Sequence, residues 1–127
     1  MTKPLILLAA CCLSVSAWAA DTDGACDQAG NDFETLTCLN RAYEAAEQTL
    51  NASYKELIGL LDADGRARLR SHQLAWLKTR NAQCSQRQGT RTSVDPRCTT
   101  KVTAARAQWL QARIGECKNG GCVNENL

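Results

Sequence analysis

An even set of six cysteines beyond residue 25 constrains the fold of this chain more than any other feature. They are Cys26, Cys38, Cys84, Cys98, Cys117 and Cys122. An even number of cysteines in a short exported chain is typical of a disulfide framework, and such a framework persists in an oxidising compartment. Spacing alone does not select one of the many possible pairings. We favour sequential pairing, because each pair then closes a short local loop.

The first 19 residues predict a secretory signal peptide. Lys3 precedes an apolar run, and the segment ends in the small-x-small pattern Ala17-Trp18-Ala19. We expect residues 20–127 to form a single helical domain with a short C-terminal disulfide tail, in a periplasmic or secreted protein without a membrane span. Leu8-Ala9-Ala10-Cys11 also fits a lipoprotein cleavage site, which would leave Cys11 lipid-anchored. The apolar run continues past this cysteine and favours the first interpretation.

Charge is divided unevenly along the chain. Residues 20–64 hold ten Asp or Glu against two Arg or Lys, a balance of −8. Residues 65–127 hold twelve Arg or Lys against three acids, a balance of +9. Such asymmetry indicates either a charged partner surface or an acidic helix that packs beside basic ones and is neutralised by them. We favour the packing interpretation, because a small helical domain brings its two halves into contact.

The apolar periodicity predicts an all-α chain of three helices with one long first helix, which the three disulfides would hold together. Spacings of three and four residues predict a first helix over about Asp32–Leu61, with a capping box formed by Asn31 and Glu34. A break follows at Asp62–Gly65, and the second helix runs to about Gln86. Ser85–Val94 is expected to be a loop. Asp95-Pro96 starts the third helix, which is expected to stop at Gly115.

Each of the last two helices shows one stripe of residues that we expect to face the core. On the second helix the stripe is Leu69, Gln73, Trp76, Arg80 and Cys84, and on the third it is Cys98, Val102, Ala105, Trp109 and Arg113.

These residues resemble a known family. The patterns Leu50-Asn51-x2-Tyr54, Gln73-x2-Trp76-x3-Arg80-x3-Cys84 and Thr103-x2-Arg106-x3-Leu110 are similar to those of the LprI-like lysozyme-inhibitor family of small exported bacterial proteins. The resemblance covers about Cys26–Arg113 and implies an all-helical antiparallel fold. It also supports pairing of Cys26 with Cys38 and of Cys84 with Cys98. The Cys117–Cys122 tail lies outside it.

Seven residues are candidate binding residues. They are Gln73, Trp76, Arg80, Arg87, Arg91, Ser93 and Asp95. The first three share a helix face, where an aromatic ring and a guanidinium suit a recognition patch. The structural alternative, which we favour, places Trp76 in the core and bonds Arg80 and Gln73 to the first helix. The other four lie in or beside the loop between Cys84 and Cys98, which is a candidate for entering a cleft.

The sequence does not indicate an enzyme. His72 is the only histidine, no nucleophile or acid frames it in a catalytic motif, and we expect it to be exposed. Metal-ligand spacings are absent from the sequence, and we expect no metal and no cofactor. Export makes nucleic acid an unsuitable target for the basic half.

Two functions remain. The first is inhibition of a lysozyme or similar muramidase, because the acids of the first helix suit a basic partner; these acids are Asp32, Glu34, Glu44, Glu47 and Glu56. The second is a cell-envelope adaptor whose basic face, formed by Arg66, Arg68 and Arg70, contacts anionic ligands or another envelope protein. The sequence leaves the oligomeric state open.

Overall fold

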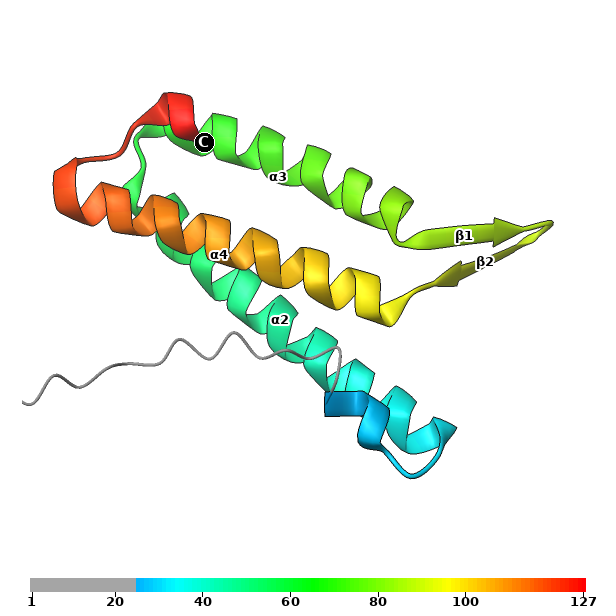
Figure 1. Ribbon diagram of the computed structural model, residues 1–127. Coiled ribbons are helices and arrows are strands. Elements are labelled where there is room, and N and C mark those ends of the chain that lie inside the picture. The colour runs from blue at the N-terminus through cyan, green and yellow to red at the C-terminus, as the bar shows by residue number, and fades with distance from the viewer. Residues whose placement is uncertain (1–24) are drawn as a thin grey trace, which may run out of the picture.

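The computed structural model describes residues 25–127, and the predicted signal peptide and Cys11 lie outside this part of the chain. Three helices follow one another in alternating directions, α2 (Asp32–Leu60), α3 (Ala63–Gln83) and α4 (Pro96–Gly120) (Figure 1). The predicted all-α antiparallel fold is thereby confirmed. Short 3-10 turns, η1 (Cys26–Gln28) and η2 (Asn124–Asn126), flank the helices.

Each helix begins at a side chain that caps its first turn. The Asn31 side chain accepts from the Glu34 amide at 3.0 Å, and the Glu34 carboxylate accepts in turn from the Gly30 amide at 2.9 Å. Asp62 caps α3 by accepting from the Gly65 amide at 2.8 Å. Asp95 caps α4, with Pro96 in the first turn as predicted. These caps satisfy amides that have no partner within their own helix.

The core joins α2 to α4. Leu50 and Leu57 of α2 are fully enclosed together with Leu110 of α4, and Leu69 of α3 completes the centre of this cluster. The predicted stripe on the third helix is wrong in part, because Ala105 is exposed and Val102 is only half-buried. The buried face of α4 consists instead of Thr99, Thr100, Thr103, Ala107, Leu110 and Ile114.

Two helix ends and the segment between α3 and α4 also differ from prediction. The second helix ends at Gln83, and α4 continues through Gly115 to Gly120. The expected loop is a β-hairpin of strands β1 (Ser85–Gln88) and β2 (Arg91–Val94), which pair antiparallel. Its two-residue turn begins at Gly89, whose φ of 61° is readily available only to glycine and belongs to a tight hairpin turn.

The three disulfides are the sequential ones, Cys26–Cys38, Cys84–Cys98 and Cys117–Cys122. The third lies at the end of α4, where the chain turns back toward the α2–α3 junction. There Leu127 enters the core cluster, and the Asn124 amide donates to Asp62 at 3.1 Å. A Cβ atom on Gly65 would clash with the Asn124 side-chain oxygen, so the tail packs closely against this glycine.

Candidate functional site

The hairpin carries three of the predicted binding residues, and its register divides them between two faces. Side chains opposite each other in an antiparallel pair lie on the same face, and they alternate along each strand. Ser85 pairs with Val94 and Arg87 with Thr92, so these four side chains share one face. Arg91 and Ser93 lie on the other. Neither Arg87 nor Arg91 makes an ion pair within residues 25–127, and both are exposed.

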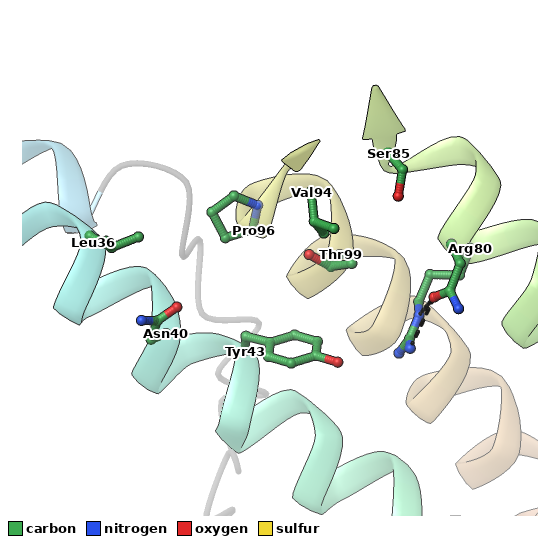
Figure 2. Close-up of a pocket in the computed structure, with 9 residues that line it drawn as sticks. Leu36, Asn40, Tyr43, Arg80, Ser85, Val94, Pro96 and Thr99 are labelled. Atoms are coloured by element: carbon green, nitrogen blue, oxygen red, sulfur yellow. Dashed lines mark hydrogen bonds between the residues drawn. The ribbon is translucent and has the colours of Figure 1, made fainter. Parts of the chain in front are cut away.

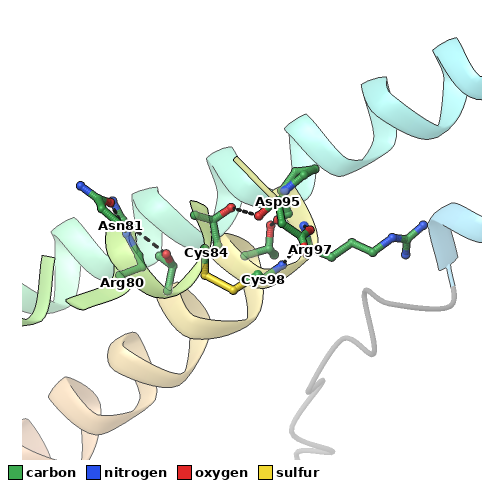
Figure 3. Close-up of a disulfide and its surroundings, with 10 residues drawn as sticks. Arg80, Asn81, Cys84, Asp95, Arg97 and Cys98 are labelled. Carbon is green, nitrogen blue, oxygen red and sulfur yellow. Dashed lines mark hydrogen bonds between the residues drawn. A yellow bond between two sulfur atoms is a disulfide. The ribbon is translucent and has the colours of Figure 1, made fainter. Parts of the chain in front are cut away.

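The base of the hairpin is held by covalent and hydrogen bonds. The disulfide Cys84–Cys98 joins the end of α3 to the first turn of α4, and Cys84 is buried (Figure 3). The Asp95 amide donates to the Cys84 carbonyl at 2.9 Å, which continues the strand pairing by one further residue. The Asp95 carboxylate meanwhile accepts from the Arg97 and Cys98 amides. Asp95 thus has a structural role at the point where the hairpin enters α4.

A cavity of about 530 Å³ opens between the hairpin base, α2 and the start of α4. We call it the junction cavity; its lining residues are Leu36, Asn40, Tyr43, Arg80, Asn81, Ser85, Val94, Pro96 and Thr99 (Figure 2). Leu36, Asn40 and Tyr43 follow one face of α2, with spacings of four and three residues. Ser85 and Val94 come from the same hairpin face as Arg87, which places that arginine on the cavity side of the hairpin.

Part of the wall of the junction cavity is formed by Arg80, which takes part in a partly buried ion pair. The Arg80 guanidinium contacts the Glu47 carboxylate of α2 and donates to the Thr103 hydroxyl of α4 at 3.1 Å. Only 9% of the Arg80 side chain is exposed, against 26% for Glu47. The pKa of Tyr43 is raised, first by burial and then by the neighbouring Glu47 carboxylate. The wall is therefore polar and electrically balanced.

The rim of the cavity keeps unused hydrogen-bonding groups. Within the described residues the side chains of Asn40 and Ser85 make no hydrogen bond, and Asn81 uses only its oxygen, which accepts from Arg80 at 3.4 Å. Leu36 and Val94 provide exposed apolar surface beside these polar groups. The cavity therefore offers amide and hydroxyl groups next to an apolar wall, a combination typical of ligand and partner sites.

Trp76 and Gln73 belong to a different environment, the space between α3 and α4. The Trp76 ring lies 5.1 Å from the Arg80 guanidinium and 5.8 Å from that of Arg106, which also stacks at 4.0 Å on Trp109. The Gln73 oxygen accepts from the Arg106 side chain at 3.0 Å. Burial lowers the pKa of Arg106. Alternating rings and guanidinium groups thus fill this interface.

The structure brings only part of the predicted set together. Arg80 lines the junction cavity and pairs with the first helix, as the structural interpretation expected, whereas Gln73 bonds to α4 and not to α2. Trp76 is half-buried against the core. Arg87 extends from the cavity side of the hairpin, while Arg91 and Ser93 face away from it. A binding role for any of the seven stays a prediction.

Sequence reasoning missed the α2 side of the cavity. Asn40, Tyr43 and Glu47 continue the same three-and-four spacing that leads to Leu50 and Leu57. Asn40 and Glu47 are polar residues at core positions of an amphipathic helix, and such residues indicate a cavity or a buried polar contact. The seven candidate binding residues did not include them, because that set was drawn from the second half of the chain, and Glu47 was considered only as an acid that faces a basic partner.

Packing neutralises part of the uneven charge of the chain. Three ion pairs join the acidic first half to the basic second half at a distance in sequence, namely Glu47–Arg80, Asp27–Arg97 and Glu56–Lys118. The packing interpretation is thereby supported. Among the α2 acids considered for a basic partner, Asp32, Glu34 and Glu44 remain exposed and make no ion pair within residues 25–127.

His72 is exposed, as predicted. Across residues 25–127 no group of three or more His, Cys, Asp or Glu side chains is placed to hold a metal ion. The same part of the chain contains no helix with the length and apolar character needed to cross a membrane.

The comparison with known families agrees with the sequence resemblance. The profile of the family described as Lysozyme inhibitor LprI matches residues 23–110, which is more than two thirds of the sequence. The chain therefore belongs to this family. No curated protein and no solved structure gives a significant match. The matched range includes the hairpin and the junction cavity, and it leaves out the tail with Cys117 and Cys122.

Proposed function

We propose that this member of the LprI lysozyme-inhibitor family is an exported binding protein, not an enzyme, which blocks lysozyme-type muramidases by placing its hairpin in their substrate cleft. The observation that carries the proposal is the hairpin Ser85–Val94 itself. It is narrow and exposed, it projects from the helices, and its base is closed by the Cys84–Cys98 disulfide. A segment that is already ordered loses less conformational entropy when it binds.

The arginines of the hairpin suit the chemistry of that cleft. Glycoside hydrolases commonly act through two carboxyl groups that flank the scissile bond. A guanidinium can donate two parallel hydrogen bonds to a carboxylate. Arg87 and Arg91 lie on opposite faces of the hairpin and make no ion pair within the described part of the chain, so each is available to one wall of a cleft.

The exposed acids of α2 favour association with a basic enzyme. Lysozymes are commonly basic, and complementary charge raises association rates at low salt. Five acids were considered for this role from the sequence, but Glu47 and Glu56 are engaged in ion pairs. We assign the steering role to Asp32, Glu34 and Glu44.

The proposal includes the compartment and the domain. The signal-like leader and the three disulfides support a periplasmic or secreted location, where such bonds persist. We further propose that residues 20–127 act as one helical domain.

The alternative, an envelope adaptor with a basic face, is less well supported. Arg68 pairs with Asp64, and the Arg66 side chain donates to the Ile58 carbonyl. Of the three arginines of that face, only Arg70 makes no side-chain hydrogen bond or ion pair within residues 25–127.

Inhibition of egg-white lysozyme on a suspension of bacterial cell walls tests the proposal. We expect micromolar protein to slow clearing of the suspension at low salt. The variant Arg87→Ala/Arg91→Ala should lose most of this effect. Arg70→Ala/Lys78→Ala is the matched control, because it removes two exposed cations of α3 and should inhibit like the wild type. Clearing that is unaffected by the wild-type protein would refute the proposal. Equal inhibition by the two double variants would show that the hairpin is not the inhibitory element.

A further inference from the structure

Two arms of the molecule point away from the same end of the helices and diverge. One is the N-terminal part of α2 with η1, and the other is the hairpin (Figure 1). Each arm contains a disulfide. Cys26–Cys38 joins η1 to α2 within the first arm, and Cys84–Cys98 closes the base of the hairpin. The junction cavity lies where the arms meet, since it is lined from both of them. The arrangement suits a partner whose surface enters between the arms.

The arms carry opposite charge. Residues 32–44 of α2 hold the exposed acids Asp32, Glu34 and Glu44 against a single cation, Arg41. The hairpin holds Arg87 and Arg91 and no acid. A complementary partner therefore presents basic surface to α2 and acidic groups to the hairpin. A basic muramidase with two carboxyl groups in its cleft has this distribution.

The chemistry of the cavity indicates what enters it. The charge of Arg80 is already matched by Glu47, so the wall gives little net attraction to an ionised group. The rim offers the whole side-chain amide of Asn40 and the unused NH2 group of Asn81, which can bond to the donor and acceptor of a peptide group. Leu36 and Val94 are 52% and 59% exposed, and both retain apolar surface that a guest could cover. The guest should therefore be uncharged, carry a peptide group for the two asparagines and cover the apolar surface. An uncharged side chain on a peptide backbone does all three.

We propose that the junction cavity is a second docking point for the muramidase, which receives an apolar side chain from a loop at the rim of the enzyme's cleft. Asn40 and Asn81 bond to the backbone of that loop, while the hairpin occupies the cleft beside it. The inference rests on the proposed function, because that function supplies the occupant. It adds a contact that depends on apolar burial, whereas the contacts of the hairpin depend on charge.

The different salt dependence of the two contacts gives the test. The variant Leu36→Gln/Val94→Thr makes the cavity wall polar with little change of volume, and both positions are exposed enough to leave folding intact. Leu74→Gln/Val123→Thr is the matched control, because these residues are 61% and 47% exposed and lie outside the cavity. Binding to egg-white lysozyme is measured by calorimetry at low and high salt, alongside inhibition.

We expect the cavity variant to raise Kd about tenfold and the control variant to change it less than about twofold. The loss in the cavity variant should be the same at both salt concentrations, because apolar contacts are not screened. The loss caused by Arg87→Ala/Arg91→Ala should shrink at high salt.

Each alternative outcome is decisive. Equal Kd values for the cavity and control variants would overturn the second docking point and leave the inhibitory role intact. A wild-type protein that neither binds nor inhibits would overturn both. Dimerisation of the free protein that only the cavity variant abolishes would assign the cavity to a second copy of the chain. Binding of an N-acetylated chitooligosaccharide that the cavity variant alone loses would assign it to a glycan; either result would overturn the proposal.

Discussion

Replacement of Glu47 by Gln should destabilise the protein by leaving a buried cation without its counter-charge. Removal of one partner from a fully buried pair costs about 3–5 kcal/mol, whereas an exposed pair contributes about 1 kcal/mol or less. The Glu47–Arg80 pair lies between these cases, because Arg80 is 9% exposed and Glu47 26%. Arg80 keeps its bonds to Thr103 and Asn81. We therefore expect Glu47→Gln to lower the free energy of unfolding by about 2 kcal/mol.

Replacement of Arg80 itself should cost less. Arg80→Met removes the buried charge and fills the space of its aliphatic stem, and the remaining Glu47 is exposed enough for water to reach it. The loss of the cation–π contact with Trp76 at 5.1 Å is worth about 0.5–1 kcal/mol, and a methionine sulfur beside the ring replaces part of it. We expect a loss of about 1 kcal/mol for Arg80→Met. The double variant should be no worse than Glu47→Gln alone, since the charge that lacked a partner is gone.

Urea unfolding followed by circular dichroism at the helical band, with the disulfides intact, measures these differences. Glu44→Gln is the control, because this acid is exposed, makes no ion pair within the described residues and lies one turn away. It should change the free energy of unfolding by less than about 0.5 kcal/mol. A larger loss for Arg80→Met than for Glu47→Gln would refute the argument, because the arginine would then stabilise the fold without needing its counter-charge.

Two further predictions concern the α2–α3 junction and the tail. Hydrogen bonds from the Gly65 amide and then from Asn124 lower the pKa of Asp62 below its ordinary value of 3.8. The stabilising effect of the ionised Asp62 carboxylate is therefore complete above pH 3.8 and is lost as the pH falls through the lowered pKa. The melting temperature of Asp62→Asn should accordingly fall less than that of the wild type on acidification below pH 4. Parallel curves of melting temperature against pH would contradict this. Leu127→Ala should lower the free energy of unfolding by about 2 kcal/mol, because Leu127 is buried in the core cluster, while Val123→Ala, at an exposed position, should be nearly neutral in the same urea assay.

Local interactions made much of this fold predictable from the sequence. The caps at Asn31 and Asp95 depend on side chains that bond within one helical turn, so their residue types identify them. The disulfides join cysteines close together in sequence, and short-range closure was the basis for pairing them. The long first helix followed from a regular apolar spacing that the structure buries at Leu50 and Leu57.

The hairpin was missed because nothing in its side chains indicates a sheet. Seven of its eight strand residues are exposed, and it has no alternation of apolar and polar residues. Its stability comes from the disulfide at its base, the bond between Asp95 and Cys84, and the turn at Gly89. The disulfide and the Asp95–Cys84 hydrogen bond depend on how α3 and α4 are placed relative to each other. The periodicity of apolar residues does not predict that placement, and only the glycine is visible in the sequence.

The core face of α4 differs from the predicted stripe because three of its buried positions are threonines. Thr99 and Thr100 donate their hydroxyl protons to the carbonyls of Asp95 and Pro96 four residues earlier, at 2.7 Å in each case. Thr103 accepts from Arg80. A threonine whose hydroxyl has a partner can be buried at little cost and then packs through its methyl group. The helix also continues through Gly115, where the sequence predicted its end. A glycine within a helix costs only about 1 kcal/mol, and Ile114 packs into the core beside it.

The junction cavity follows from the same helical spacing that builds the core. Along one face of α2, Leu57 and Leu50 are enclosed, whereas Glu47, Tyr43 and Asn40 occupy the equivalent positions toward the N-terminus. Polar side chains at these positions cannot close against α4 as leucines do, because their polar groups need partners. Arg80 supplies one for Glu47, and Asn40 has none within the described residues. The main core cluster therefore extends no farther toward the N-terminus of α2 than Leu50, so that the position of the candidate site is set by where leucine gives way to polar residues on this face of the helix.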